Sequence, residues 1–198
     1  MVINERPETR GGQPFVIFHI PKTGGTTVRR LYGELAYNNT KDVIDQHETP
    51  DAFWKRCPQF REFEFDVVVR NPWRRMESMF RHQFRFHNVW RHQGYTFTRF
   101  MEELDVKDSL PYKSRLNNAV MVPQTPYLFL RGEKLFKWPI ESIDVWCNFT
   151  TDIPVLHASP GPPCIWSKKA FENFEKYYGQ DVKNLGHMYE KPDDLLEE

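Results

Sequence analysis

Cysteine is scarce in this sequence, and the three that occur, Cys57, Cys147 and Cys164, show no Cys-x-x-Cys spacing. An odd number of scattered cysteines argues against a disulfide framework and favours a reducing compartment. Long apolar runs are also lacking, because no stretch of about 18 apolar residues occurs. The N-terminal residues are polar and have no apolar segment typical of a signal peptide. We therefore expect a cytoplasmic protein without a membrane span.

An excess of charge of either sign is absent as well, since Lys plus Arg and Asp plus Glu both number 27. Zero net charge argues against binding nucleic acid by bulk electrostatics, so any basic patch must be local. Aromatic side chains are abundant, at 15% of the 198 residues, which predicts a folded domain with a bulky core. We expect a single domain over residues 15–190, a flexible N-terminal lead-in at 1–14 and an acidic C-terminal tail at 191–198.

Buried strands and helices alternate along the chain. The run FVIFHI at 15–20 is apolar on both faces apart from His19, and FEFDVVVR at 63–70 is a second strand of this kind. A helix is predicted after each strand, at 26–37 and from about Pro72 onward. This alternation predicts an α/β fold with a central, mostly parallel sheet flanked by helices. The sequence also predicts a strand at 42–47, a helix from Pro50 capped by Thr49, a helix near 97–104, a strand at 143–149 and a helix capped by Ser167.

The turn after the first strand reads PKTGGTT, and it has the composition of an anion site. A strand end, a glycine turn and a helix start offer backbone N–H groups and a positive dipole end to an anion. Gly24 and Gly25 let the backbone approach a phosphate, Thr26 and Thr27 add hydroxyl donors, and Lys22 supplies charge. A purely structural tight turn would use the same glycines, so the loop needs support from its surroundings.

The order of residues in this loop differs from that of an ATP- or GTP-binding loop. In GxxxxGK[ST] the lysine follows the last glycine, whereas Lys22 precedes both glycines. The second strand ends in Arg70 instead of the aspartate that holds magnesium in many nucleotide hydrolases. The loop therefore departs from the ATP- and GTP-binding pattern in both respects.

The second strand delivers Arg70 to the carboxyl edge of the sheet, where ligands of open α/β folds bind. On the helix that follows, Arg74, Ser78, Arg81 and Arg85 form one polar stripe. Three interpretations stay open for this Arg-rich region. It can be a solvated helix face, which suits Arg75, Arg91 and Arg99; it can bind nucleic acid; or Arg70 and Ser78 can hold a phosphate.

Together, HIPKTGGTT and VVVRNPWRRMESMF resemble the two signature elements of the sulfotransferases that use 3′-phosphoadenosine 5′-phosphosulfate (PAPS). The likeness is greatest to the carbohydrate (Golgi-type) sulfotransferases and their small bacterial and viral relatives. The expected fold is then an α/β, P-loop-type three-layer fold. The resemblance implies that Lys22 binds the oxygen between sulfonate and 5′-phosphate, that the loop from Thr23 through Gly24, Gly25 and Thr26 to Thr27 cradles the 5′-phosphate, and that Arg70 with Ser78 holds the 3′-phosphate.

The acceptor hydroxyl needs a base, and His47 is the first candidate. Some carbohydrate sulfotransferases resembling this chain carry a catalytic histidine in such a place, ahead of a short helix. A histidine titrates near neutrality and can take the acceptor proton. Glu48 is a second candidate base, Asp45 could orient His47, and His47 could instead be an ordinary polar loop residue.

These residues lead us to expect an enzyme that transfers a sulfonate from PAPS to a hydroxyl on a saccharide or glycoconjugate, without a metal. Its expected partners are PAPS, the product 3′-phosphoadenosine 5′-phosphate (PAP) and the acceptor. Two alternatives stay open: a P-loop kinase of a small metabolite, and a non-catalytic Arg-rich nucleic-acid-binding protein.

Overall fold

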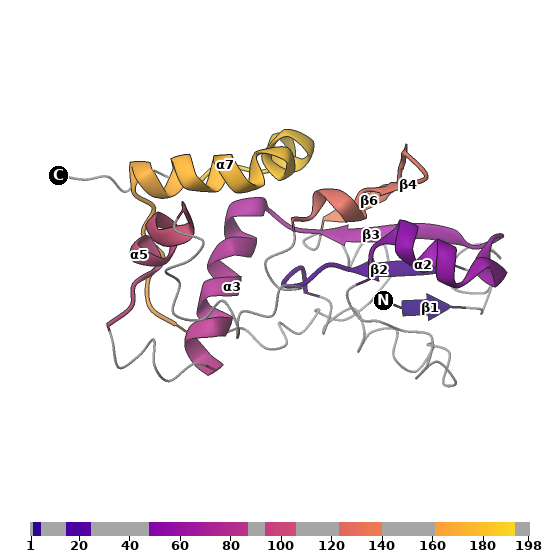
Figure 1. The fold of residues 1–198 in the computed structure, drawn as a ribbon, viewed down its shortest axis with the longest axis horizontal. Helices are drawn as coiled ribbons and strands as arrows, with labels where there is room; N and C mark the ends of the chain where they lie inside the picture. The colour runs from indigo at the N-terminus through magenta and orange to yellow at the C-terminus, as the bar shows by residue number, and fades with distance from the viewer. Residues whose placement is uncertain are drawn as a thin grey trace, which may run out of the picture. The chain divides into compact units, whose positions relative to one another are not determined.

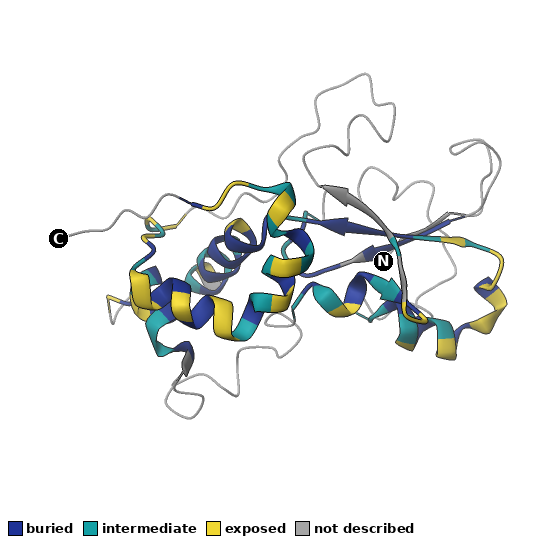
Figure 2. Cartoon of the chain, turned by 90° about the horizontal axis from the view of Figure 1, so that it is seen from above, coloured by how far each residue is buried: buried dark blue, intermediate teal, exposed yellow. Residues whose placement is uncertain are grey.

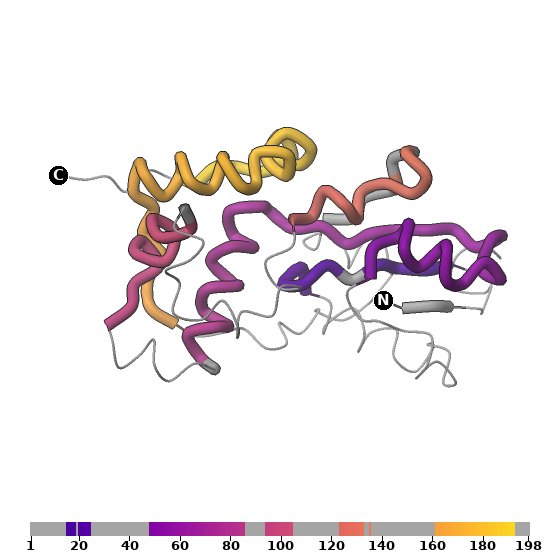
Figure 3. The backbone as a smooth tube through the Cα atoms, viewed as in Figure 1, coloured from indigo at the N-terminus to yellow at the C-terminus, as the bar shows by residue number. Residues whose placement is uncertain are grey.

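The computed structural model describes residues 2–4, 15–24, 48–86, 94–105, 123–139 and 161–192 (Figure 1). These residues belong to two compact units. The first contains the described residues up to Arg70 and those from Gln124 to 139, and the second contains those from Asn71 to Pro123 and from 161 onward. The chain leaves the first unit for the second between the strand Glu64–Val69 (β3) and the helix Pro72–Phe86 (α3), both drawn as parts of the continuous backbone tube in Figure 3. The sequence did not predict this subdivision.

The first unit is built on a four-stranded sheet with the strand order β1-β2-β3-β6. The last three strands in this order are parallel, and β1 pairs antiparallel with β2. The strand bounds are Val2–Asn4 for β1, Phe15–His19 for β2, Glu64–Val69 for β3 and Phe136–Pro139 for β6. The described part of the chain is therefore α/β with a small, mostly parallel sheet, as the sequence predicted at that level.

The two central strands are those predicted at 15–20 and 63–70. Phe15 to Phe18 and Asp66 to Val69 are all buried, which explains why the sequence is apolar on both faces of these strands. The two flanking strands were not predicted. β1 lies inside the expected flexible lead-in, and β6 ends in Pro139, a residue type that argues against a strand because it has no backbone N–H.

Helix α2 (Pro50–Arg56) packs on the sheet through aromatic side chains. Phe53 is completely buried, with its ring centroid 5.7 Å from that of Phe18 on β2 and 6.3 Å from that of Phe65 on β3. The helix begins as predicted, because the Thr49 hydroxyl accepts a hydrogen bond from the N–H of Ala52 at 3.4 Å. A short 3-10 helix, η2 (Pro58–Phe60), then leads into β3.

A small hairpin completes the first unit. The 3-10 helix η5 (Thr125–Tyr127) precedes β4 (Phe129–Leu130), which pairs antiparallel with β5 (Glu133–Lys134). A hydrogen bond joins the hairpin turn to α2: the carboxylate of Asp51 on α2 accepts from the backbone N–H of Arg131 in the turn at 2.7 Å.

The second unit is helical. It contains α3 (Pro72–Phe86), α5 (Phe97–Glu102) with the 3-10 helix η3 (Glu103–Asp105), and α7 (Lys168–Leu185) with the 3-10 helix η7 (Gly186–Met188). Figure 2 shows buried and exposed stretches alternating along these helices. The buried faces meet in one apolar cluster, formed by Trp73, Met76, Met79, Phe80, Tyr95, Phe97, Phe100, Met101, Leu104, Trp166, Ala170, Phe171, Phe174 and Tyr178.

Each helix of this unit begins at a polar cap that the sequence carries. Asn71 Oδ1 accepts from the N–H groups of Trp73 and Arg74 at 3.0 and 3.1 Å and so caps α3. Thr96 caps α5, and the Ser167 hydroxyl accepts from the N–H of Ala170 to cap α7 at 3.2 Å. The helices predicted near Pro72, near 97–104 and after Ser167 are therefore confirmed.

One prediction for α3 is wrong. Arg75 was expected on the solvated face, but only 2% of it is exposed. Arg75 and the buried Asp181 of α7 both act electrostatically on the Tyr178 hydroxyl, so opposite charges lie near one another in this interior. Burial, the largest effect, raises the pKa of Tyr178 to about 12.

Several predicted elements cannot be compared with the structure. The helix at 26–37 and the strands at 42–47 and 143–149 lie outside the described residues. Of the predicted acidic tail, the first two residues are described: the Lys191 ammonium lies 4.1 Å from the ring centroid of Phe171, and Pro192 is buried. The helices that are described include none with the length and apolar character needed to cross a membrane.

Candidate functional site

The turn that follows β2 is tightly hydrogen-bonded. The Ile20 carbonyl accepts from the backbone N–H of Thr23 at 3.3 Å and from its hydroxyl at 2.9 Å, and Thr23 is completely buried. Lys22 has a φ of 68° and Gly24 a φ of 83°. The left-handed conformation costs a residue with a Cβ about 1–2 kcal/mol. Glycine explains the second of these angles, whereas Lys22 is held in a strained conformation of the kind that clusters at functional sites.

Arg70 reaches this turn from the neighbouring strand. β2 and β3 pair in parallel up to His19 and Val68, so the residues that follow them leave the sheet at the same edge. The Nη1 atom of Arg70 donates a hydrogen bond to the Lys22 carbonyl at 3.2 Å. The structure therefore brings together Lys22 and Arg70, two of the predicted site residues that lie 48 positions apart in the chain.

The electrostatics of the turn suit an anion. Burial and, second, the nearby Arg70 guanidinium lower the pKa of the Lys22 ammonium to about 8. Both effects disfavour the charged form of Lys22, and no carboxylate among the described residues counteracts them. A phosphate or sulfate bound between the two side chains would stabilise both positive charges, so the pair forms a cationic site at the carboxyl end of the sheet.

Gln124 is a third residue of this site, and the sequence did not single it out for a role. Its side chain is completely buried and contacts the backbone of Arg70 at two atoms. In the sequence, Gln124 stands out only as a side-chain amide between Pro123 and the apolar stretch that begins at Tyr127. Because Gln124 lies 54 positions from Arg70, no local pattern predicts the contact.

The remaining predicted loop residues are not placed by the structure. Gly25, Thr26 and Thr27 lie outside the described residues, as do the candidate base His47 and its expected neighbour Asp45.

The second candidate base, Glu48, is described and is already engaged. The Arg56 side chain donates from Nε to Glu48 Oε1 at 3.0 Å and from Nη2 to Glu48 Oε2. Both oxygens of Glu48 are therefore engaged by Arg56, and Glu48 would have to give up a hydrogen bond to reach an acceptor hydroxyl. This arrangement favours His47 over Glu48 as the expected base.

Ser78 belongs to the second unit, where it is half-buried on α3. The polar stripe predicted around it exists, with Arg74 and Arg85 exposed and Arg81 partly so. Within this unit the positive charge of the stripe is partly neutralised by Glu77 of the same helix.

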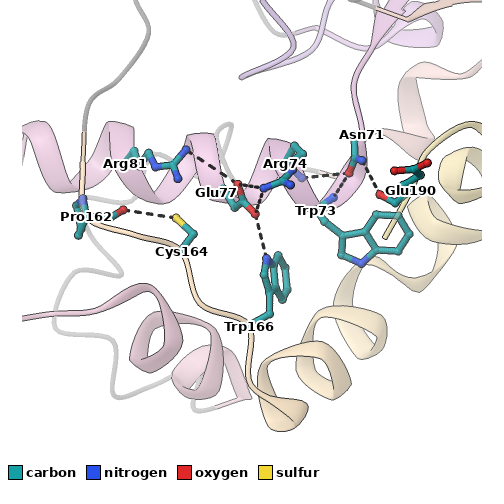
Figure 4. Close-up of polar contacts among 9 residues, drawn as sticks. All are labelled: Asn71, Trp73, Arg74, Glu77, Arg81, Pro162, Cys164, Trp166 and Glu190. Atoms are coloured by element: carbon teal, nitrogen blue, oxygen red, sulfur yellow. Dashed lines mark hydrogen bonds and ion pairs between the residues drawn. The ribbon is translucent and has the colours of Figure 1, made fainter. Parts of the chain in front are cut away.

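Glu77 forms a compact hydrogen-bond and ion-pair network with residues of its own helix and with Trp166, which precedes α7 (Figure 4). The Nη1 atom of Arg74 donates to both carboxylate oxygens at 3.1 Å, and Arg81 forms an ion pair at 4.0 Å. The indole N–H of Trp166 donates to Glu77 Oε1 at 3.1 Å. Since Glu77 is only 2% exposed, these contacts satisfy a buried carboxylate and use part of the positive charge of the helix.

Comparison with known proteins yields no relative: no protein-family model, curated protein or solved structure matches this chain. The assignment of function therefore depends on the chemistry of the site itself. Within the described ranges, no group of three or more His, Cys, Asp and Glu side chains is arranged to hold a metal ion.

Proposed function

We propose that this protein is a PAPS-dependent sulfotransferase that transfers a sulfonate to a hydroxyl of a saccharide or glycoconjugate. One observation carries the proposal: the Arg70 guanidinium lies on the backbone of the Lys22 turn, at the carboxyl ends of two adjacent parallel strands. Two cations supplied by neighbouring strands lie close together there, which suits a nucleotide that carries several anionic groups. The α/β architecture with a mostly parallel sheet agrees with the expected P-loop-type fold.

The position of Lys22 suits sulfonyl transfer. The acceptor oxygen attacks sulfur, the bond between sulfur and the bridging oxygen breaks, and the electron pair leaves on the 5′-phosphate of PAP. Lys22 would neutralise the negative charge that develops on this oxygen, while the buried turn holds it in place. His47 would accept the proton of the acceptor hydroxyl, and Arg70 would bind the 3′-phosphate.

The alternative of an Arg-rich nucleic-acid-binding helix loses support. Arg75 is buried, and Arg74 and Arg81 share the buried carboxylate of Glu77. Fewer positive charges are then available to neutralise the phosphates of a nucleic acid.

Titration calorimetry with PAP tests the proposal. Wild-type protein should bind PAP without magnesium, and Arg70→Ala should weaken binding by about 10- to 150-fold, because a hydrogen bond to a charged group contributes about 1.5–3 kcal/mol. Arg70→Lys keeps the charge but loses the planar fork, so its affinity should fall between the two.

Arg61→Ala is the matched control, since Arg61 is exposed and stacks on Trp54 with its guanidinium carbon 5.8 Å from the ring centroid. This variant should bind PAP as the wild type does. Magnesium-dependent binding of ATP with no binding of PAP would instead support the kinase alternative. Salt-dependent binding of RNA or DNA that Lys22→Ala leaves unchanged would support the nucleic-acid alternative.

A further inference from the structure

The Gln124 amide makes a paired contact with the backbone of Arg70. Its Nε2 donates to the Arg70 carbonyl at 2.9 Å, and its Oε1 accepts from the Arg70 N–H at 3.1 Å. The amide can meet both partners in one orientation only, because turning it over would face donor with donor and acceptor with acceptor. Since Gln124 is completely buried, water cannot replace either hydrogen bond without rearrangement.

The contact with Gln124 supplies the backbone hydrogen bonds of the residue that follows the end of the sheet. The ladder between β3 and β6 stops at Val69 and Pro139, and proline has no N–H to donate. Arg70, the next residue of the chain, is paired by a side chain in the way that a neighbouring strand would pair it.

Gln124 is itself held in place by the segment that carries it. The N–H of Tyr127 donates to the Gln124 carbonyl at 2.9 Å at the start of η5, and Tyr127 and Leu128 are each 1% exposed. The amide therefore projects from a buried, hydrogen-bonded turn, which limits the positions that it can adopt.

A continuous series of contacts runs from Gln124 to the cationic turn. Gln124 fixes the backbone from which the Arg70 side chain starts, and the Arg70 guanidinium donates to the Lys22 carbonyl at 3.2 Å. Lys22 has a left-handed φ of 68°, a conformation that persists only where its surroundings enforce it. Displacement of Arg70 would therefore also loosen the turn that carries Lys22.

We propose that Gln124 is a positioning residue of the anion site, whose amide sets the geometry of both Arg70 and Lys22 by clamping the Arg70 backbone. The identity of the anion as PAP rests on the proposed function, whereas the clamp itself does not. Gln124 need not touch the ligand: it acts through Arg70.

A double-mutant cycle separates this role from a general loss of stability. Gln124→Ala should weaken PAP binding by about tenfold in the wild-type background, a size within the range of measured couplings between contacting residues. In the Arg70→Ala background the same change should weaken binding no further, because the guanidinium that it positions is gone. The thermal midpoint should fall equally in both backgrounds, since the backbone atoms that Gln124 clamps are present in both.

Gln83→Ala is the matched control, because Gln83 is a buried glutamine on α3 in the second unit. It should lower the thermal midpoint but leave PAP affinity unchanged. Where Gln124→Ala does not fold, Gln124→Met replaces it, since methionine has a similar volume and lacks the amide. Equal PAP affinity in Gln124→Ala and wild type, or an equal loss of affinity in both backgrounds, would overturn the proposal.

A second measurement needs no ligand. An NMR titration of the lysine CεH₂ signals should place the Lys22 pKa near 8 in the wild-type protein and in Gln83→Ala. In Gln124→Ala it should rise toward the ordinary lysine value, because a loosened turn is less buried and lies farther from Arg70. An unchanged Lys22 pKa would overturn the clamp. If the wild type fails to bind PAP, the proposed function falls, and this titration alone then decides the role of Gln124.

Discussion

Binding of PAP should be accompanied by proton uptake at Lys22, and this is the prediction that follows most directly from the cationic turn. In the free protein, burial and the Arg70 guanidinium lower the pKa of Lys22 to about 8. A bound phosphate stabilises the ammonium and raises its pKa, so a Lys22 that was neutral must take up a proton when PAP binds. The protein should therefore bind PAP more weakly as the pH rises through 8.

The size of the effect follows from the titration curve of a single group. With a pKa near 8, Lys22 is about 10% neutral at pH 7, about 50% at pH 8 and about 90% at pH 9. If the bound state stays protonated throughout, PAP affinity falls about tenfold between pH 7 and pH 9. Proton uptake rises over the same range from about 0.1 to about 0.9 per PAP bound.

Calorimetry in two buffers with different ionisation enthalpies measures this uptake directly. The variant Lys22→Arg provides the comparison, because arginine keeps its charge over the whole range and should bind with nearly constant affinity. Lys55→Ala, an exposed lysine on α2, should keep the pH dependence of the wild type. A wild-type protein that binds PAP with no proton uptake at pH 8 would show that Lys22 is not the lysine at the anion, or that its pKa is not lowered.

Three further predictions concern single substitutions. Lys22→Met should prevent PAP binding and raise the thermal midpoint at pH 7, because the wild type buries a charged lysine whose folded pKa lies below its unfolded one. As the pH rises from 8 toward 10.5, the wild-type midpoint should rise to meet that of the variant. A variant midpoint below that of the wild type at pH 7 would contradict this. His47→Ala should leave the PAP affinity unchanged in calorimetry but sharply reduce turnover, and unchanged turnover would remove His47 from the mechanism. Trp166→Phe should lower the free energy of unfolding by about 1–3 kcal/mol in urea titrations, because the buried Glu77 carboxylate loses an N–H donor; a stability equal to that of the wild type would show that the contact contributes nothing.

The parts of the fold that the sequence predicted are those whose signals are local. Unbroken apolar runs marked β2 and β3, and the side chains of Thr49 and Ser167 marked the starts of α2 and α7. Each of these signals depends on neighbours within a few residues, so it can be read along the chain.

The errors have a common physical origin in contacts between distant segments. Arg75 was assigned to solvent because a charged residue on a helix is usually exposed, yet it is buried with Asp181 of α7 nearby. β6 was not predicted. Its last residue, Pro139, is of a type that argues against a strand, and the fold tolerates it at the end of the ladder, where it pairs with Val69.

The candidate site shows the same division. Lys22 and Arg70 were identified from the sequence, since each follows a buried strand, and parallel strands end at a common edge. Neither the left-handed backbone of Lys22 nor the amide of Gln124 could be predicted, because both depend on contacts across the unit. The proximity of Lys22 and Arg70 was therefore predictable from the sequence, and the geometry of their contact was not.

Transfer of labelled sulfonate from PAPS to a panel of saccharides, phenols and steroids tests the central claim most directly. We expect incorporation of label into a saccharide hydroxyl without added metal, abolished by Lys22→Ala and by Arg70→Ala and retained by Arg61→Ala. No transfer to any acceptor, together with no binding of PAP by the wild-type protein, would contradict the account.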